Sequence, residues 1–466
     1  MEFNLKKIDI NKYQLSKTSA MRVEVYVYAT PELLLNINQD LSLEQLAEAA
    51  SLAKVVSPVI AMPDVHEGFG LPIGGIMATE SLISVGAVGM DINCGVRLMT
   101  SNLNYNQNDF SPEKLRTLIN QIERLIPIGL GGKHKKRLSL DLQKMCEQGV
   151  EYLVKQGFAP KEDLEKIEEK GKMEQADFSA LGERAKNRAL KQAGTLGSGN
   201  HFIEIQRVEK IFDPQIASLW GLRENQICIM IHSGSRALGQ QTCVDFTNLF
   251  WKLKDKYGID VPRQGLAALP LSTPEGQRYF SAMASSVNFA FCNRGMMAYY
   301  IRKVFLKNFS APLSLLYDVC HNVAKLETHQ GKQLLVHRKG ATRALPAGHH
   351  QNPKIYMNTG HPAIVPGSMG TTSYVMVGLE KNQETYYSIN HGAGRLMSRT
   401  QAKRQIQEED FVKSMKDIVF NKPFWQIADE APQAYKDIVK VIDTLVEAGL
   451  TKKIAKLAPL AVIKGN

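Results

Sequence analysis

Glycine-rich motifs that carry histidine, cysteine, aspartate or arginine recur along this chain from residue 62 almost to its end. We find no internal repeat and no linker rich in proline or serine between them. Side chains from motifs so far apart can meet at one site only if the whole chain folds as one unit. We therefore predict a single large domain over 1–466, and a composition that is 44% hydrophobic supplies its core.

The chain is expected to belong to the α+β class. MRVEVYVYAT alternates like a strand, and the glycine-rich run 55–98 predicts short strands joined by tight loops, because glycine costs a helix interior about 1 kcal/mol relative to alanine. The residues after Gly449, KKIAKLAPLAVIKGN, are interpreted as a short basic tail, and GLGGKHKKRL as a solvated turn. Helices are expected in LSLEQLAEAASLA, after the N-cap Ser111, at 137–156, 161–172 and 275–307, and in QAYKDIVKVIDTLVEAG.

The charge and the cysteines limit the class of protein. Lys and Arg number 57 against 46 Asp and Glu, and the net charge of +11 suits a polyanionic partner such as RNA without proving one. The six cysteines are dispersed, with no CxxC pair, and no signal peptide or membrane-length apolar run is visible, so we expect a reduced, cytoplasmic protein. These cysteines are Cys94, Cys146, Cys228, Cys243, Cys292 and Cys320.

Six of the eleven histidines lie in loop-like motifs beside glycine, asparagine, aspartate or arginine. One such histidine is more often a packed core residue than a ligand, but six of them favour chemistry. These six are His66, His201, His232, His321, His337 and His391.

The sequence DINCG predicts a metal site. Asp91 and Cys94 lie three residues apart in a glycine-flanked loop, where a carboxylate and a thiolate can point to one place. With His201, His232 and His321 they form a ligand set for a first-row divalent ion, and a bridging thiolate could hold two ions. Cys94 alone would be interpreted as a small buried hydrophobic residue, and ligand type alone would favour zinc.

Three motifs place small residues beside arginine: SGSR at 233–236, RKGATR at 338–343, and GAGR at 392–395, which is followed by Arg399. Glycine lets backbone N–H groups approach a phosphate, and arginine adds a charge-assisted contact. Together these motifs favour binding of nucleotide or RNA phosphates. No Walker A pattern or GxGxxG motif is present.

His391, in NHGAGR, is compatible with three roles. An imidazole beside glycine and close to Arg395 can attack a phosphoryl group and form a phosphoramidate, with the arginine neutralising developing charge. A fifth metal ligand and a structural histidine are the other two, and the chemistry of the residues alone does not rank them.

At these residues the chain resembles the RtcB family of RNA ligases. The motifs that carry the resemblance occur in the family's order and extend, with the closing VIKG, from residue 62 almost to the C-terminus. They are MPDVHEGFGLPIGG, VGMDINCGVRL, GTLGSGNHFIEIQ, HSGSRALG, DVCHNVAKLE, HRKGATRALP, PGSMGTTSYV and HGAGRLMSR.

The resemblance implies one large α+β domain, with mixed or antiparallel sheets around a metal centre, peripheral helices and a helical insertion at about 111–190. It implies an enzyme that uses GTP and two manganese ions to join an RNA 3′-phosphate or 2′,3′-cyclic phosphate to a 5′-hydroxyl. A small activating protein, archease, is an expected partner. Glu67 and Asn390 depart from the residues expected at their positions, which suggests a role in RNA repair rather than tRNA splicing.

The resemblance also implies a role for each site residue. Asp91, Cys94, His201, His232 and His321 fall on metal-ligand positions, with Cys94 as the bridge, and His391 on the histidine that becomes guanylylated. Arg236, Arg395 and Arg399 are similar to residues that meet phosphates, and Glu204 to one that faces the guanine edge. The positions expected to contact the guanylate are Asn200, Glu204, His321, Asn322, Ser368, His391, Gly392, Ala393, Gly394, Arg395, Tyr435 and Lys464.

Two alternatives come from other functional classes. A metal-dependent phosphoesterase that hydrolyses RNA ends would use the same metal ligands, but it needs neither a nucleophilic His391 nor a guanine pocket with Glu204 and Lys464. A catalytically silent RNA-binding protein would have no use for five convergent metal ligands, so it is the less favoured of the two.

Overall fold

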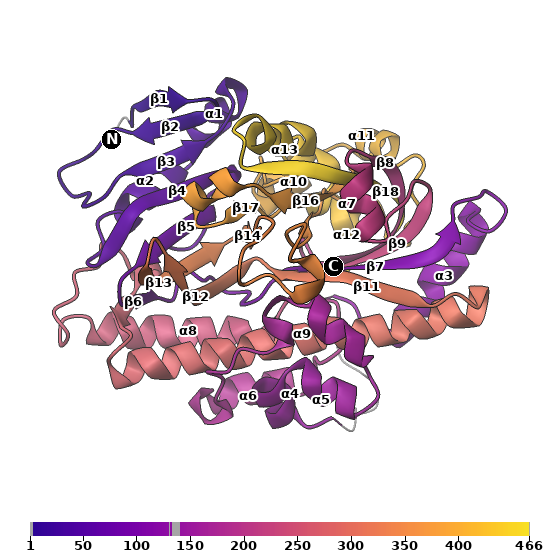
Figure 1. Ribbon diagram of the computed structural model, residues 1–466, viewed down its shortest axis with the longest axis horizontal. Coiled ribbons are helices and arrows are strands. Elements are labelled where there is room, and N and C mark those ends of the chain that lie inside the picture. Colours follow the sequence, from indigo (N-terminus) through magenta and orange to yellow (C-terminus); the bar gives the residue numbers. More distant parts are fainter. Residues whose placement is uncertain (1–2, 130, 133–139, 466) are drawn as a thin grey trace.

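The structure is a computed structural model that describes residues 3–129, 131–132 and 140–465. Much of the basic loop GLGGKHKKRL, and the start of the helix expected at 137–156, lie outside the described residues. Within the described part of the chain, most strands belong to two seven-stranded sheets, which Figure 1 shows largely on the left and on the right of the molecule.

The first sheet is mixed. Its neighbouring strands are antiparallel except β3 and β4, which pair in parallel. The strand expected in MRVEVYVYAT is β3, and the expected helix after it is α2 (Ser42–Ala49), preceded by α1 (Pro31–Ile37). In spatial order the strands are β1 (Leu5–Asp9), β2 (Lys12–Leu15), β3 (Val25–Tyr28), β4 (Val55–His66), β5 (Ile73–Thr79), β13 (Lys332–Lys339) and β12 (Asn322–His329).

The second sheet is antiparallel throughout. In spatial order its strands are β11 (Leu313–Cys320), β7 (Gly95–Asn104), β9 (Gln226–Ser233), β8 (Phe202–Ile211), β18 (Thr451–Lys464), β16 (Ser373–Gly378) and β15 (Ala363–Val365). Two short pairs complete the strands: β6 (Leu82–Ser84) with β10 (Ala268–Pro270), and β14 (Ala341–Arg343) with β17 (Ser388–Asn390).

The interpretation of the C-terminal residues as a basic tail is wrong, because they form β18 inside the second sheet. Ile454 and Leu457 are fully buried in the core, whereas the lysines of the strand find acidic partners. Lys452 Nζ lies 2.6 Å from Asp213 Oδ2, and Lys456 Nζ lies 2.8 Å from Glu209 Oε2. The lysine side chains of this strand therefore form ion pairs with acidic residues of other segments, while its apolar side chains pack in the core.

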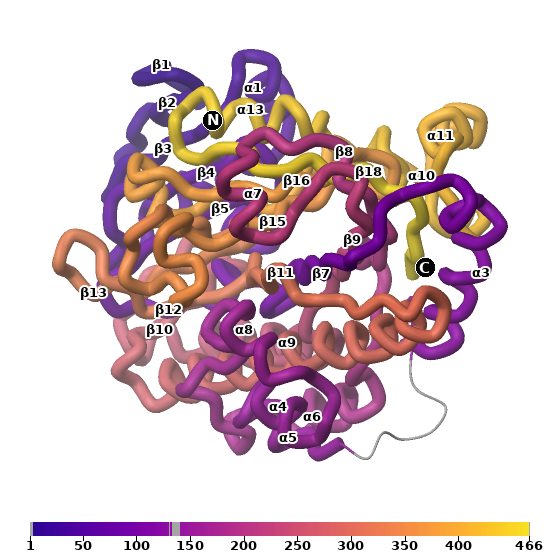
Figure 2. Tube along the Cα trace, turned by 45° about the vertical axis from the view of Figure 1, so that its right-hand side comes forward, coloured from indigo at the N-terminus to yellow at the C-terminus, as the bar shows by residue number. Residues whose placement is uncertain are grey.

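Helices cover the sheets. In Figures 1 and 2, α8 (Arg236–Leu253) and α9 (Pro274–Phe309) run beneath the sheets, and α4 (Leu142–Gln148), α5 (Val150–Lys155) and α6 (Glu183–Ala189) lie on their far side. The helix expected at 275–307 is α9, and the one expected after Ser111 is α3 (Pro112–Leu125), whose first turn Ser111 caps. The remaining α-helices of the described residues are α7 (Pro214–Leu219), α10 (Arg399–Gln405), α11 (Glu408–Ser414), α12 (Phe424–Ile427) and α13 (Ile438–Glu447).

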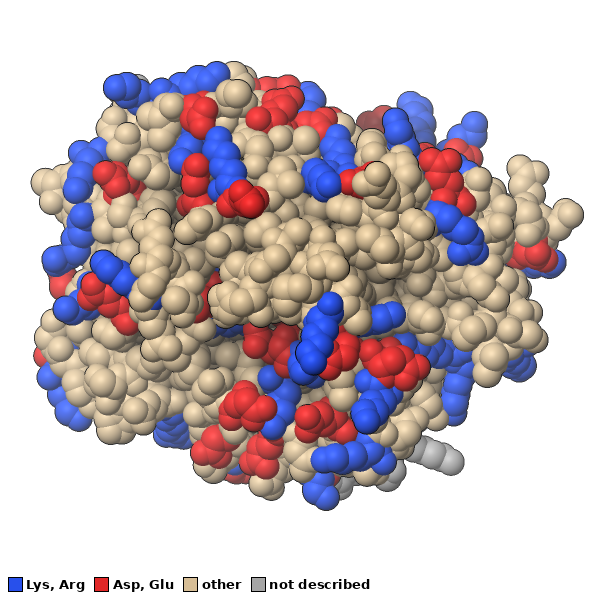
Figure 3. All heavy atoms as spheres, in the orientation of Figure 1, with Lys and Arg blue, Asp and Glu red and all other residues tan. Residues whose placement is uncertain are grey.

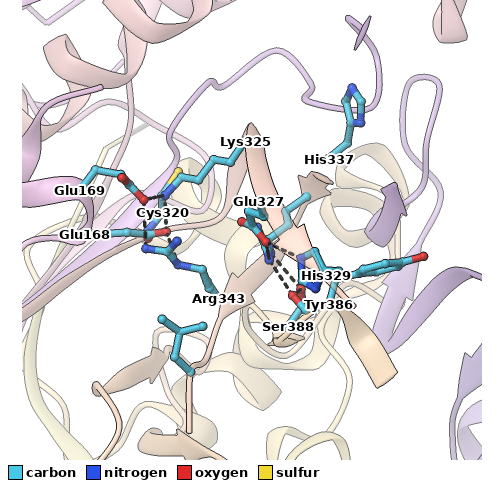
Figure 4. Close-up of polar contacts among 12 residues, drawn as sticks. Glu168, Glu169, Cys320, Lys325, Glu327, His329, His337, Arg343, Tyr386 and Ser388 are labelled. Carbon is cyan, nitrogen blue, oxygen red and sulfur yellow. Dashed lines mark hydrogen bonds and ion pairs between the residues drawn. The ribbon is translucent and has the colours of Figure 1, made fainter. Parts of the chain in front are cut away.

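The helix expected at 161–172 is replaced by two 3-10 turns, Lys161–Lys166 and Glu168–Gly171. Glu169 and Lys170 have positive φ values of 54° and 53°, which a helix does not allow. The chain bends there because Glu168 and Glu169 both reach Lys325, at 2.6 and 2.9 Å (Figure 4). The ion pairs with Lys325, of which the one to Glu168 is buried, thus override the helical periodicity of the sequence.

The α+β class, with mixed and antiparallel sheets, is confirmed. On the face drawn in Figure 3, basic and acidic side chains are interspersed, so the net charge does not mark a uniform basic surface there. Among the described residues, no helix is long and apolar enough to cross a membrane.

Candidate functional site

Four adjacent strands of the second sheet bring the predicted metal ligands together. Cys94 directly precedes β7, His232 lies in β9, and His201 directly precedes β8. His321 directly follows β11. In the register of the sheet, Gly95 pairs with both Cys320 and Ser233, and Phe202 pairs with His232. Hydrogen bonding between the strands therefore places residues from four distant motifs at one end of the sheet.

The side chains of these residues converge. Cys94 Sγ lies 3.2 Å from His232 Nε2 and 3.6 Å from His201 Nε2. His201 Nε2 lies 2.7 Å from Asp91 Oδ2, and the ring centroids of His232 and His321 are 5.6 Å apart. Ligand atoms of Asp91, Cys94 and His201 all lie within 4.8 Å of one another. We call the five residues Asp91, Cys94, His201, His232 and His321 the ligand cluster.

The chemistry of the ligand cluster fits a divalent cation. His201 Nδ1, His232 Nδ1 and both ring nitrogens of His321 are buried and have no hydrogen-bond partner within the described part of the chain. Burying polar atoms without hydrogen-bond partners costs free energy. A cation coordinated by the lone pairs of these nitrogens would remove part of that cost. Burial and neighbouring cationic groups hold the pKa of His232 and of His321 well below the usual value, so both rings are neutral, as metal ligands must be.

The electrostatics of the two anionic ligands are coupled. Burial and the charge of Asp91 raise the pKa of the Cys94 thiol well above its usual value. Burial also works to raise the pKa of Asp91, but His201 and Arg236 lower it overall. A divalent cation in the cluster would favour the thiolate, because a coordinated thiol loses its proton.

Arg294, on α9, binds the backbone beside two residues of the ligand cluster. It is fully buried, and Nη1 donates to Asn93 O at 2.9 Å and to Ser233 O at 2.7 Å. These carbonyls belong to the residues next to Cys94 and His232. Its charge is balanced by Asp318, whose Oδ1 accepts from Nε at 2.9 Å. Arg294 thus fixes the backbone on both sides of the ligand cluster.

Glycine is required at Gly234 because a Cβ atom there would lie 2.3 Å from Asp91 Oδ1. The same holds for Gly394, which has φ +73° and where a Cβ atom would lie 2.1 Å from Asp64 O. Both glycines let loops from different motifs pack closely against site residues.

A cavity of about 960 Å³ opens beside the ligand cluster. Asp91, Cys94 and His232 line it, whereas His201, Glu204 and Arg236 are not among its lining residues. The predicted guanylate and phosphate residues that line it are Asn200, His321, Asn322, Ser368, His391, Gly392, Ala393, Gly394, Arg395, Arg399, Tyr435 and Lys464.

His391 lies against a carboxylate from the first seven-stranded sheet. It directly follows β17, and its Nδ1 lies 2.6 Å from Oδ2 of Asp64, a fully buried residue of β4. The backbone N–H groups of His391 and Gly392 also donate to Asp64 Oδ2, at 3.0 and 3.2 Å. Nδ1 faces Asp64 at ion-pair distance but forms no hydrogen bond within the described part of the chain, and Nε2 is the ring nitrogen left to react in the cavity. The rings of His391 and His321 have centroids 5.5 Å apart, so His391 adjoins the ligand cluster.

Four of the polar side chains that line the cavity converge on one buried carboxylate, Glu430. Lys464 Nζ lies 3.1 Å from Glu430 Oε2, and the Tyr435 hydroxyl donates to the same oxygen. Arg395 Nη1 donates to Oε1 at 3.3 Å, and Arg399 Nε lies 3.9 Å from it. We call Arg395, Arg399, Tyr435 and Lys464, together with Glu430, the Glu430 cluster.

Glu204 lies on β8 beside β18, the strand that carries Lys464. Its Oε2 accepts a hydrogen bond from Gln206 at 2.6 Å, whereas its buried Oε1 has no partner among the described residues. Burial raises the pKa of Glu204 to about 8, against the opposing effects of Gln206 and Lys464. An unpaired buried acceptor of this kind suits a ligand that donates hydrogen bonds.

Arg236 has a different setting from the one expected of a phosphate-binding residue. Its Nε donates to Thr195 Oγ1 at 3.2 Å, and its charge acts on Asp91. It therefore lies beside the ligand cluster rather than in the lining of the cavity.

The prediction that RKGATR meets phosphates is wrong for both of its arginines. Arg338 Nη2 donates to Glu327 Oε2 at 2.9 Å within a buried ion pair. The buried Arg343 pairs with the buried Glu168 at 3.3 Å and with the partly exposed Glu169 at 3.0 Å (Figure 4). His337, which lies apart from these pairs in Figure 4, is buried in β13 with Nδ1 3.2 Å from Met77 O. His337 and Arg338 thus support the first sheet and Arg343 supports the short strand β14, and a sequence gives no sign of the acidic partners of these arginines.

His66 lines the cavity and its Nδ1 lies 2.9 Å from Asp64 O, so of the six loop-like histidines only His337 falls away from the site. The sequence missed Asp64, Arg294 and Glu430. Asp64 could have been found, because it lies in the same MPDVHEG motif as His66. Arg294 and Glu430 lie in a helix and in a short turn that carry no distinctive pattern.

Comparisons with known proteins relate the chain to one family. The family model described as tRNA-splicing ligase RtcB matches residues 45–465. The chain is similar to the tRNA-splicing ligase RtcB of Thermococcus kodakarensis, at 42% identity over 99% of both chains. It is 41% identical to that of Archaeoglobus fulgidus over the full length of both. It is also 42% identical to the RNA-splicing ligase RtcB of Mycobacterium tuberculosis, over 90% of this chain and all of the relative.

Proposed function

This chain belongs to the RtcB family, and from that premise we propose that it is an RNA ligase dependent on GTP and manganese. It joins an RNA end with a 3′-phosphate or 2′,3′-cyclic phosphate to an end with a 5′-hydroxyl. The observation that carries the proposal is the position of His391, which Asp64 orients within one cavity shared with the ligand cluster.

The ligand cluster would hold two manganese ions, with Cys94 as the residue able to bridge them. Its unpaired imidazole nitrogens support this assignment, whereas the identity of the metal rests on the family. Divalent ions bound there would act as Lewis acids that polarise phosphoryl oxygens. Arg294 keeps the ligands in place by holding the backbone next to Cys94 and His232.

His391 acts as the nucleophile. Its Nε2 attacks the α-phosphorus of GTP, a nitrogen–phosphorus bond forms, and pyrophosphate leaves with the electron pair of the broken bond. Asp64 keeps the proton on Nδ1 and stabilises the positive charge that the ring gains during attack, as the carboxylate does in a Ser-His-Asp triad. Arg395 and Arg399 lie in or beside the cavity lining, where they can neutralise phosphate charge.

The guanylate then passes to the RNA. A cyclic phosphate is first opened to a 3′-phosphate, which takes the GMP from His391. The 5′-hydroxyl attacks the activated phosphorus, and GMP leaves as the two ends are joined. Glu204 would accept hydrogen bonds from the guanine edge, and its unpaired Oε1 supports this role. Lys464 and Tyr435 would complete the guanine pocket.

The biological setting is part of the proposal. The relatives are named for splicing, and tRNA splicing is one setting. We add RNA repair as a second setting because Glu67 and Asn390 depart from the residues expected at their positions. We include archease as an activating partner on the basis of the family.

An assay of RNA ends separates this proposal from a phosphoesterase. The protein is incubated with manganese and two RNAs, one ending in a 3′-phosphate and one beginning with a 5′-hydroxyl, with and without GTP. A ligase gives a joined RNA only with GTP, and the 3′-phosphate is retained at the junction. Release of inorganic phosphate without joining, independent of GTP, would support the phosphoesterase and overturn the proposal.

A further inference from the structure

The Glu430 carboxylate lies behind one wall of the cavity. It is only 2% exposed and does not itself line the cavity, whereas the four side chains that it contacts do. Arg395 and Arg399 lie just before and at the start of α10, Tyr435 follows the 3-10 turn Pro432–Ala434, and Lys464 ends β18. One acidic group thus ties together three separate segments of the chain at the cavity wall.

The contacts with Arg395, Tyr435 and Lys464 also constrain the direction of these three side chains, whereas Arg399 is more than half exposed and lies farther away. Arg395 Nη1 donates both to Glu430 and to the Tyr435 hydroxyl, at 3.3 and 3.1 Å, and its guanidinium lies over the Tyr435 ring at 4.9 Å. Lys464 is 4% exposed, and Glu430 is the acidic group paired with it at 3.1 Å. Long side chains such as lysine and arginine lose much conformational entropy on binding a ligand unless they are already held.

The charges of the cluster favour a single state of Glu430. Burial would raise the pKa of this carboxyl, but Lys464 and Arg395 lower it below the usual value. The group is therefore an anion that accepts hydrogen bonds from Arg395 and Tyr435 and forms ion pairs with Lys464 and Arg399. Glu430 differs from a surface ion pair, which is exposed to solvent and contributes little to stability, because Glu430 is buried and has four contacts.

The neighbouring residue, Asp429, offers a natural control. Its side chain lies 3.5 Å from Lys403, a residue of α10 whose side chain is 55% exposed. Asp429 also accepts from Arg395 Nη2 at 2.6 Å, but through its backbone carbonyl. Removal of the Asp429 charge therefore leaves the contacts of the cavity wall in place.

We propose that Glu430 is a positioning residue that sets the selectivity of the cavity for a guanosine triphosphate. It fixes Lys464, Tyr435 and Arg395 in the directions that the nucleotide requires, and it prevents the cations from binding any polyanion without regard to its base. The inference rests on the proposed function, since it assumes that GTP enters this cavity.

The test measures binding of α,β-methylene-GTP, α,β-methylene-ATP and inorganic tripolyphosphate to the full chain with manganese. The methylene analogues cannot transfer a nucleotide to His391, so affinity is read without turnover. The variants are Glu430→Gln, which removes the charge, and Glu430→Asp, which keeps the charge but withdraws the carboxylate by one methylene. Asp429→Asn is the matched control, and thermal unfolding shows whether each variant is folded.

If Glu430 is a positioning residue, both of its variants bind the GTP analogue roughly tenfold or more weakly, the effect of one lost charge-assisted contact. Their preference for the GTP analogue over the ATP analogue falls, tripolyphosphate binds at least as tightly as before, and Asp429→Asn behaves like the wild type. If Glu430→Asp keeps wild-type selectivity, or if Glu430→Gln binds all three ligands more tightly by the same factor, the role is electrostatic and the inference is wrong.

A failure of the proposed function looks different. In that case the wild-type protein itself shows no preference for the GTP analogue over the ATP analogue. The inference about Glu430 is overturned separately, when the wild type is selective and a folded Glu430→Asp variant is equally selective.

Discussion

Asp64 Oδ2 lies 2.6 Å from His391 Nδ1, and this contact joins β4 of the first seven-stranded sheet to the residue that follows β17 of the short β14–β17 pair. Asp64 also accepts the backbone N–H of His391 and, through its own backbone carbonyl, contacts His66 Nδ1 at 2.9 Å. A single buried aspartate therefore orients two imidazoles of the cavity, and each ring is left with its Nε2 free of that contact.

Asp64→Asn should slow nucleotide transfer to His391 by roughly 10²–10⁴-fold, because an amide cannot stabilise the cationic ring and favours the wrong tautomer. Binding of the non-transferable GTP analogue should change little. Rapid-quench measurement of protein labelling gives the rate. Asp40→Asn is the control, since Asp40 lines the cavity but contacts Glu67 N rather than His391. Equal rates in wild type and Asp64→Asn would contradict this role of Asp64.

Cys94→Ser should abolish labelling and lower the number of manganese ions bound, because a hydroxyl is a much poorer bridging ligand than a thiolate. Electron paramagnetic resonance titration counts the bound manganese. Cys243→Ser serves as control, because Cys243 is buried beside the Thr247 hydroxyl and belongs to α8. Full manganese occupancy at wild-type affinity in Cys94→Ser would show that the sulfur is not a ligand.

Arg294→Lys should weaken manganese binding and lower the free energy of unfolding by about 3–5 kcal/mol, the cost of breaking a buried charge pair. A single ammonium cannot reach Asn93 O, Ser233 O and Asp318 together, as the guanidinium does. Urea titration with and without manganese measures both effects. Arg302→Lys, in the same helix and paired with Asp163, should destabilise the fold without a specific loss of metal affinity. If both variants lose metal affinity equally, the loss does not come from the contacts that Arg294 makes beside the ligand cluster.

The affinity for GTP should depend on pH through Glu204. Burial raises the pKa of Glu204 to about 8, so the carboxyl carries a proton at neutral pH and must lose it to accept hydrogen bonds from guanine. Binding should therefore tighten as pH rises from 6 to 8, by up to about tenfold per pH unit, and level off above 8. Calorimetry with the α,β-methylene analogue of GTP measures the effect. Glu204→Gln should remove this dependence, and an unchanged pH profile in that variant would exclude Glu204 as its source.

The sequence predicted the elements whose pattern is local. The strand β3, the capped helix α3 and the long helix α9 all have periodicity or caps that act within a few residues. The C-terminal strand β18 was not predicted, because a lysine-rich segment is typical of an exposed tail. Its acidic partners lie on other segments and cannot be recognised from the sequence. The 3-10 turns near Glu168 were missed for the same reason, since Lys325 and Arg343 are distant in sequence.

The candidate site was predictable where chemistry and motif coincide. Asp91, Cys94 and His232 converge as expected, because DINCG and IHSG lie on neighbouring strands. Arg338 and Arg343 lie in a glycine-containing motif like that of Arg395. Only their burial in the structure distinguishes them from an arginine that lines the cavity. Glu430 could not be predicted, since its importance lies in four contacts with residues that are far from it or lack a shared motif.

The most direct test of His391 as the nucleophile is transfer of label from GTP carrying radioactive phosphorus at the α position, in the presence of manganese. The wild-type protein is expected to acquire a label that is labile in acid and stable in base, as a phosphoramidate is, and His391→Ala is expected to acquire none. A wild-type protein that acquires no label, or a His391→Ala protein that acquires it fully, would contradict this role of His391.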